Sequence, residues 1–200
     1  MKKWVALLSG TVALCMAASA QAQSLMLDDF ERPANRLGGQ GSVYVMDPSS
    51  AVAQRTDKDP KNGSRMLMLE YDKKPKGGPH DSGGWCGYFT PLKFGSRYFD
   101  ASPYKTLSFW VRGAQGSENF VVGIADRYWD SVGDSVKSEE IGKYLPAGKI
   151  TTEWQKAAIP LSDLYVDYKE LAAIAICFEG SIFPNGQGKG AIFVDDVVLE

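Results

Sequence analysis

The segment DRYWD places two neighbouring aromatic rings between charged side chains. Aromatic faces stack on the apolar faces of sugar rings, while flanking carboxylate and guanidinium groups can hydrogen-bond the sugar hydroxyls. The candidate carbohydrate-binding residues of this segment are Asp126, Arg127, Tyr128 and Trp129. Tryptophan in a β-rich protein also serves as core, as we expect for Trp154 in TTEWQKAAIPL.

Residues that would indicate catalysis are sparse. A zinc site or a histidine-based triad would have to rest on His80, the single histidine, which lies in a loop rich in Gly and Pro. No P-loop, dinucleotide-binding fingerprint or G-x-S-x-G element follows a suitable strand. Asp126 and Asp130 could in principle act as a glycosidase pair, which needs two carboxyl groups at a defined separation. We expect a non-catalytic protein and keep a small glycoside hydrolase as an alternative.

Two acidic clusters, LDDFE and FVDDV, lie near the two ends of the chain. The terminal strands of a β-sandwich commonly pair, and this pairing would bring the two clusters together. Carboxylate oxygens are ligands that suit Ca²⁺. The alternative is that these acids face solvent on edge strands, where charge discourages edge-to-edge association.

The N-terminal segment is typical of a secretory signal. It has the order Met-Lys-Lys, an apolar run from Trp4 to about Ala18, and an A-x-A cleavage pattern ending at Ala22. The apolar run is too short for a membrane span, which needs about 20 apolar residues. We expect residues 1–22 to be removed and the mature protein to be periplasmic or secreted.

Two cysteines, Cys86 and Cys177, follow the predicted signal. In an oxidising compartment they could form a disulfide, and equally they could be two small buried side chains. The formal net charge of −2 argues against nucleic acid as a partner, because such binding depends on clustered Lys and Arg.

The rest of the chain consists of short β-rich runs separated by turn residues, with almost no helical periodicity. The predicted strands are Leu25–Phe30, Val43–Met46, Arg65–Tyr71, Trp85–Leu92, Thr106–Arg112, Phe120–Asp126, Gln155–Pro160, Ile174–Phe178 and Ala191–Leu199. Only LSDLYVDYKEL could form a short helix, and DRYWD is expected in a loop. So many short strands in residues 23–200 predict a single all-β domain, an antiparallel two-sheet β-sandwich of the jelly-roll type.

Alternation along the strands predicts which side chains face the core. In KTLSFWVRG the inward residues are Leu107, Phe109 and Val111. In ENFVVGIAD the inward residues are Phe120, Val122 and Ile124. The small residues Val121, Gly123 and Ala125 are left on the opposite face of that strand, which meets solvent or ligand.

Several segments together resemble the galactose-binding-like jelly rolls. They are LMLDDFE, NGSRMLMLEY, GGWCGYFTPL, YKTLSFWVRG, TTEWQKAAIPLSDL and AIFVDDVVL. The resemblance is to family 11 carbohydrate-binding modules and to the related complex I intermediate-associated domain. It implies a concave sheet face that binds a β-glucan poly- or oligosaccharide, and a structural calcium ion. The resemblance to the complex I intermediate-associated domain implies instead that the same fold binds a protein partner.

The resemblance also implies which residues would hold the calcium ion. Asp195 matches the terminal-strand aspartate of the family, and Asp29 and Glu31 match its N-terminal partner. The loop DPKNGS would supply backbone oxygens around Asn62 and Ser64.

For the cleft, the resemblance implies Trp85 and Phe178, the latter beside Glu179. If Trp85 faces the cleft, alternation turns Cys86 into the sandwich. The same argument turns Cys177 inward and Phe178 outward. The two thiols would then share one side of the sheets, which makes a disulfide geometrically conceivable.

Overall fold

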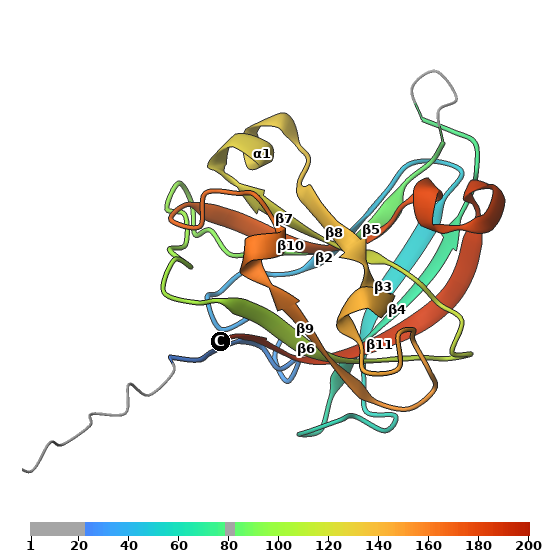
Figure 1. The fold of residues 1–200 in the computed structure, drawn as a ribbon, viewed down its shortest axis with the longest axis horizontal. Helices are drawn as coiled ribbons and strands as arrows, with labels where there is room; N and C mark the ends of the chain where they lie inside the picture. Colours follow the sequence, from blue (N-terminus) through green and yellow to red (C-terminus); the bar gives the residue numbers. More distant parts are fainter. Residues whose placement is uncertain (1–22, 79–82) are drawn as a thin grey trace, which may run out of the picture.

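The computed structural model describes residues 23–78 and 83–200, so the predicted signal segment and His80 lie outside the described residues. Two antiparallel sheets pack face to face (Figure 1). The first sheet has the order β3 (Ser50–Thr56), β4 (Met66–Lys73), β11 (Gly188–Leu199), β6 (Thr106–Gly113) and β9 (Gln155–Pro160), with β1 (Leu25–Asp28) paired to β11. The second has the order β2 (Ser42–Val45), β5 (Cys86–Pro91), β10 (Leu171–Phe178), β7 (Val121–Asp126) and β8 (Val136–Glu140). The predicted two-sheet β-sandwich is confirmed.

The core lies between the two sheets, and its composition follows the predicted alternation. From β6 it takes Leu107, Phe109 and Val111, and from β7 and the residue before it Phe120, Val122 and Ile124. All six are buried, and fully burying a side chain of this size stabilises the fold by about 1.5–3 kcal/mol. The terminal strands pair as expected, with Leu25 opposite Leu199. None of the helices among residues 23–78 and 83–200 has the length and apolar character needed to cross a membrane.

The structure adds three elements that the sequence patterns did not predict. Strands β3 and β8 lie at the edges of their sheets and carry mostly polar or small residues, so their apolar signal is weak. DRYWD begins a helix, α1 (Arg127–Val132), where a loop was expected. Asp126 caps α1 by accepting a hydrogen bond from the amide of Trp129 at 3.0 Å, and Gly133 ends it in the left-handed conformation with φ 74°. The segment LSDLYVDYKEL holds only a 3₁₀ turn, Leu161–Asp163.

Candidate functional site

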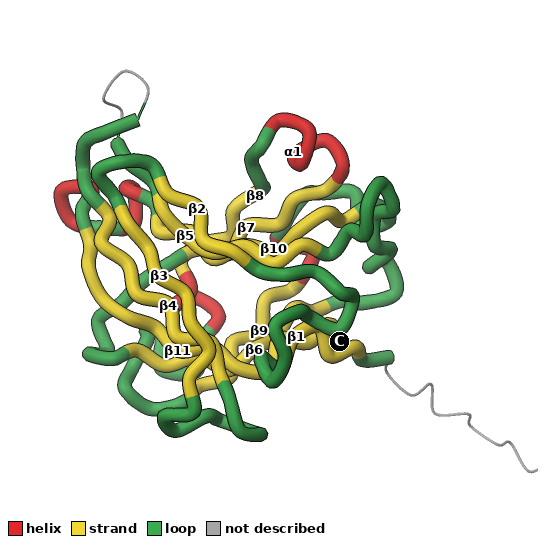
Figure 2. Tube along the Cα trace, turned by 180° about the vertical axis from the view of Figure 1, so that it is seen from behind, coloured by secondary structure: helices red, strands yellow, loops and turns green. Residues whose placement is uncertain are grey.

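An open cleft of about 1110 Å³ lies on the face of the five-stranded sheet that points away from the core. Its floor comes from the two central strands, β10 and β7, whose outward side chains are small. The floor residues are Val121, Gly123, Ala125, Ala173 and Ala175. Three of these are the residues that alternation left on the non-core face of their strand. Figure 2 shows α1 standing at one side of this sheet, away from the β2 edge.

One wall of the cleft is aromatic and comes from β2 and β5. Trp85 and Phe89 both line the cleft, because they lie four residues apart and therefore on one face of the extended chain. Trp85 is 36% exposed, so its ring is available to a ligand.

Tyr44 completes this wall and lies opposite Gly87 in the β2–β5 register. A Cβ at Gly87 would stand 2.4 Å from the hydroxyl oxygen of Tyr44, so the glycine leaves room for the phenol ring. Burial raises the pKa of Tyr44 well above its usual range, and the hydroxyl therefore stays protonated.

The opposite wall comes from α1 and β8. Trp129 lines the cleft, whereas its neighbour Tyr128 lies outside the lining and is 65% exposed. The two rings meet edge to face, with centroids 5.4 Å apart and planes at 82°. Of the predicted ligand-binding residues, the structure thus brings Trp85, Trp129 and Glu179 together around one cleft.

The polar lining of the cleft is mainly acidic, with carboxylates from Asp130, Asp134, Glu139, Glu140 and Glu179. Lys93 donates to Asp130, and Lys137 donates to Asp134 at 2.6 Å. Although burial opposes ionisation of Asp134, the hydrogen bond from Lys137 holds its pKa below the usual range. The three glutamates have no cationic partner among the residues that the structure describes. The cleft therefore carries net negative charge.

Asp126 and Arg127 hold α1 in place and do not line the cleft. The carboxylate of Asp126 is buried and accepts hydrogen bonds from the amides of Trp129 at 3.0 Å and Asp167 at 2.9 Å. Arg127 forms an ion pair with Glu170 at 2.8 Å. The prediction that Asp126 binds a ligand is wrong, because its carboxylate is buried under α1 and does not line the cleft.

The same contacts bear on the hydrolase alternative. Asp126 is a helix cap, and Asp130 accepts hydrogen bonds from Lys93 and from the hydroxyl of Tyr98, at 3.3 Å for the latter. Asp126 is committed to capping α1, and Asp130 is paired with Lys93. This arrangement does not support a glycosidase pair made of these two carboxylates.

Phe178 belongs to the core, so its prediction as an outward ligand contact is wrong. It is fully buried, and its ring lies flat against Tyr71 with centroids 3.7 Å apart. In the β10–β5 register Phe178 lies opposite Cys86, and paired residues share a face. Cys177 therefore faces the other way, toward the cleft side of the sheet, where its Sγ lies beside Gly123. The sequence AIAICFEG indicates this orientation, because the large residues Ile174, Ile176 and Phe178 are two positions apart and therefore share the core face.

The possible disulfide between Cys86 and Cys177 is not formed, and the two cysteines are the small buried side chains of the alternative interpretation. The two side chains point to opposite faces of the sheet, and both thiols are free and buried. Burial raises the pKa of each thiol to about 11, so neither is reactive as a thiolate near neutral pH.

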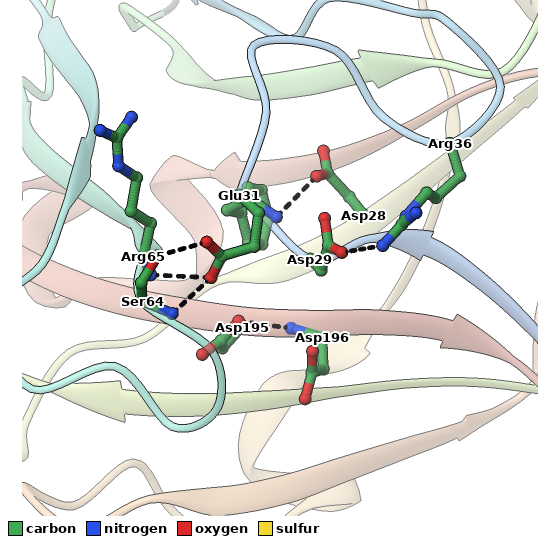
Figure 3. A network of polar contacts seen from close by, with 9 residues as sticks. Asp28, Asp29, Glu31, Arg36, Ser64, Arg65, Asp195 and Asp196 are labelled. Atoms are coloured by element: carbon green, nitrogen blue, oxygen red, sulfur yellow. Dashed lines mark hydrogen bonds and ion pairs between the residues drawn. The ribbon is translucent and has the colours of Figure 1, made fainter.

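Apart from Asp29, the predicted calcium ligands lie in two hydrogen-bonded clusters at loop 61–65, one around Glu31 and one around Asp195 (Figure 3). Glu31 accepts the amides of Ser64 at 2.6 Å and Arg65 at 2.9 Å. Asp195 is fully buried and accepts the amides of Lys61 at 2.9 Å and Asn62 at 3.1 Å. The loop thus presents N–H groups to these carboxylates, where backbone oxygens were expected.

Other features of this region concern its charge. Asp29 forms an ion pair with Arg36 (Figure 3). Burial raises the pKa of Asp195 to about 6, and neighbouring Asp196 also raises it. Among the described residues, no three His, Cys, Asp or Glu side chains form a group that could hold a metal ion.

Sequence reasoning missed several residues of the cleft, notably Tyr44, Phe89 and Lys137. Phe89 shares its strand face with Trp85, so the alternation of GGWCGYFTPL could have found it. Lys137 lies on β8, a strand whose polar composition gave no sign that it belongs to the sheet.

Comparison with known proteins identifies the family of this chain. The sequence model of the family described as Carbohydrate binding domain 30 matches residues 36–200. No curated protein matches the chain. The family 30 module of the cellulosomal cellulase Cel9D-Cel44B of Clostridium thermocellum is similar in structure, with a TM-score of 0.63, 19% identity, and coverage of 89% of this chain and 97% of that chain.

Two structures of the family 11 module of Clostridium thermocellum are also similar. That of the cellulosomal cellulase Lic26A-Cel5E has a TM-score of 0.61, 18% identity, and coverage of 90% of this chain and 95% of that chain. The other contains a β-1,3-1,4-mixed-linked tetrasaccharide and has a TM-score of 0.60, 18% identity, and coverage of 88% and 94%. Identities this low establish a shared fold, and the family match spans most of the sequence. The chain belongs to the Carbohydrate binding domain 30 family and is a non-catalytic carbohydrate-binding module.

Proposed function

We propose that the cleft on the five-stranded sheet binds a poly- or oligosaccharide by stacking on Trp85, Phe89 and Trp129. The supporting observation is that these rings stand on both sides of a floor made of small side chains. A sugar ring needs an aromatic face beside it and free depth beneath it, and the small, partly exposed side chains of Ala173 and Ala175 leave that depth. No bond is made or broken, so binding is an equilibrium.

The polar lining supplies hydrogen bonds in the plane of the sugar. Glu179, Asp134 and Ser135 line the cleft and can accept hydrogen bonds from sugar hydroxyls. Each stacked ring contributes through the apolar area that it buries, at about 25 cal/mol per Å². Three such rings and several hydrogen bonds suit reversible binding of a flexible chain, which loses conformational freedom when it binds.

A neutral β-linked glucan is the glycan class that we propose first. One similar module was solved with a β-1,3-1,4-mixed-linked tetrasaccharide. The net negative lining of the cleft supports an uncharged ligand, because an acidic sugar would be repelled.

A protein partner was the alternative for this fold. A protein-docking surface is expected to be flatter and more apolar, with a polar rim. A cleft of about 1110 Å³ with carboxylates along its walls favours a glycan.

We also propose export and calcium binding as properties of the protein. The N-terminal Lys-Lys pair, the apolar run after it and the A-x-A pattern support a removed signal and a periplasmic or secreted product. The buried carboxylate of Asp195, whose pKa burial raises to about 6, lies beside Asp196, and a cation there would offset their charge.

Affinity electrophoresis against a panel of soluble polysaccharides tests the proposed function. We expect a neutral β-glucan to retard the folded chain, and Phe89→Ala to reduce the retardation. No retardation by any polysaccharide of the panel would contradict the proposal and favour a protein partner. Release of reducing sugar would contradict the non-catalytic assignment.

A further inference from the structure

The end of the cleft at α1 has a surface that the cleft itself does not use. Tyr128 carries a large aromatic ring and is 65% exposed. The cleft floor runs along β7 to Ala125, and α1 begins only two residues later. Tyr128 therefore stands where the floor ends.

Tyr128 is also joined directly to the cleft. Its ring packs edge to face against Trp129, which lines the cleft, with centroids 5.4 Å apart. Val132 of the same helix lines the cleft too and is itself exposed. The surface of Tyr128 is thus continuous with the wall of the cleft.

The helix that carries Tyr128 is fixed on several sides. Asp126 caps it and accepts the amide of Asp167 at 2.9 Å. Arg127 pairs with Glu170 at 2.8 Å and lies 4.9 Å from the centre of the Tyr98 ring. These contacts hold the backbone that carries Tyr128 in place, so a ligand that stacks on the ring does not have to order the helix.

We propose that Tyr128 forms an outer subsite, on which a glycan chain that fills the cleft continues past its α1 end. This inference rests on the proposed function, because the occupant of the outer subsite is the same chain that occupies the cleft. An exposed aromatic face next to a sugar-binding cleft can stack on a further sugar unit as the rings inside the cleft do. Short chains that fill only the cleft do not reach Tyr128, and long chains do.

The test measures affinity against chain length, by calorimetry with β-1,3-1,4-linked gluco-oligosaccharides from the trisaccharide to the octasaccharide. For the unmodified chain we expect affinity to rise with length beyond the oligomer that fills the cleft, by about three- to tenfold for one added stacking contact. Tyr128→Ala should abolish this last gain and leave the affinity for short oligomers unchanged. Tyr128→Phe keeps the ring and should keep the gain.

Tyr165→Ala is the matched control, because Tyr165 is 97% exposed and does not line the cleft. It should behave like the unmodified chain. If Tyr128→Ala weakens short and long oligomers equally, Tyr128 acts through Trp129 inside the cleft and the outer subsite is wrong. If affinity in the unmodified chain stops rising once the cleft is filled, the outer subsite is wrong while the proposed function stands. If no oligomer of any length binds, the proposed β-glucan function fails as well.

Discussion

Phe178 and Tyr71 lie face to face between the two sheets, with ring centroids 3.7 Å apart and an angle of 13° between the planes. Tyr71 comes from β4 of one sheet and Phe178 from β10 of the other, so the pair joins the two layers. Phe120 meets Phe178 edge-on, with centroids 6.4 Å apart.

Truncation of Phe178 should therefore affect stability. We expect Phe178→Ala to lower the free energy of unfolding by about 3–5 kcal/mol, because it removes a fully buried ring and leaves a cavity. Urea denaturation measures this change, with Phe178→Leu as a milder variant. A Phe178→Ala protein of normal stability that had lost glycan binding would place the ring in the cleft and contradict the structure.

The charge of the cleft predicts which glycans it rejects. Glu179 and the other unpaired glutamates should make a polyuronate bind more weakly than a neutral glucan, and added salt should reduce the difference. Glu179→Gln should narrow the difference by about threefold, as expected for one charge interaction of ~0.5–1 kcal/mol. Glu153→Gln is the control, since Glu153 is exposed and does not line the cleft. Equal binding of both polymers at low salt would show that the lining charge plays no part.

Asp28 predicts a dependence of stability on pH. Burial raises its pKa to about 6, whereas in the unfolded chain it titrates near 4. Between about pH 4 and 6 the folded state keeps a proton that the unfolded state has lost, so stability falls as pH rises through this window. Asp28→Asn keeps an acceptor for the amide of Phe30, which donates to Asp28 at 2.9 Å, and should make the fall shallower. Urea denaturation at about pH 4 and pH 6, in EDTA, measures the change in the free energy of unfolding. If this change is the same in Asp28→Asn as in the unmodified chain, Asp28 does not cause it.

Calcium should raise the midpoint of thermal unfolding if it binds beside Asp195. A ligand that binds only the folded state stabilises it by RT ln(1 + [L]/Kd), so the midpoint should rise with the concentration of Ca²⁺. Thermal melts in EDTA and in excess Ca²⁺ measure the shift, which Asp195→Asn should remove. Asp57→Asn is the control, because Asp57 is an exposed acid in the neighbouring loop. Identical midpoints in EDTA and Ca²⁺ would contradict calcium binding and leave Asp195 as an acceptor for the backbone amides of Lys61, Asn62 and Asp196.

The fold could be predicted where alternation is strong and both faces of a strand differ clearly. Alternation along β7 was enough to place Phe120, Val122 and Ile124 in the core. The small residues between them form part of the cleft floor. Edge strands such as β8 give no such signal, because an edge exposed to solvent tolerates VKSEE as well as any apolar pattern. The wall that carries Lys137 could not be predicted for that reason.

At the candidate site, the sequence did not reveal which face of β10 points to the core. The structure places Trp85 and Glu179 at the cleft, but the predicted phase of β10 is one residue out, so Phe178 and Cys177 exchange faces. In AIAICFEG both phases contain apolar residues, and only the larger size of Ile174, Ile176 and Phe178 distinguishes the inner face. A slip of one residue in a strand moves every side chain to the other face.

A comparison of two tryptophans tests whether the cleft of the five-stranded sheet is the glycan-binding site. Trp85 lines the cleft, whereas Trp110 lies on the other sheet, on β6, beneath the ammonium group of Lys61 at 4.1 Å. Calorimetric titration with the β-glucan that binds the unmodified chain should show at least a tenfold loss of affinity for Trp85→Ala, or about 1.4 kcal/mol, and no loss for folded Trp110→Ala. Full affinity in Trp85→Ala, or a loss confined to Trp110→Ala, would contradict the account.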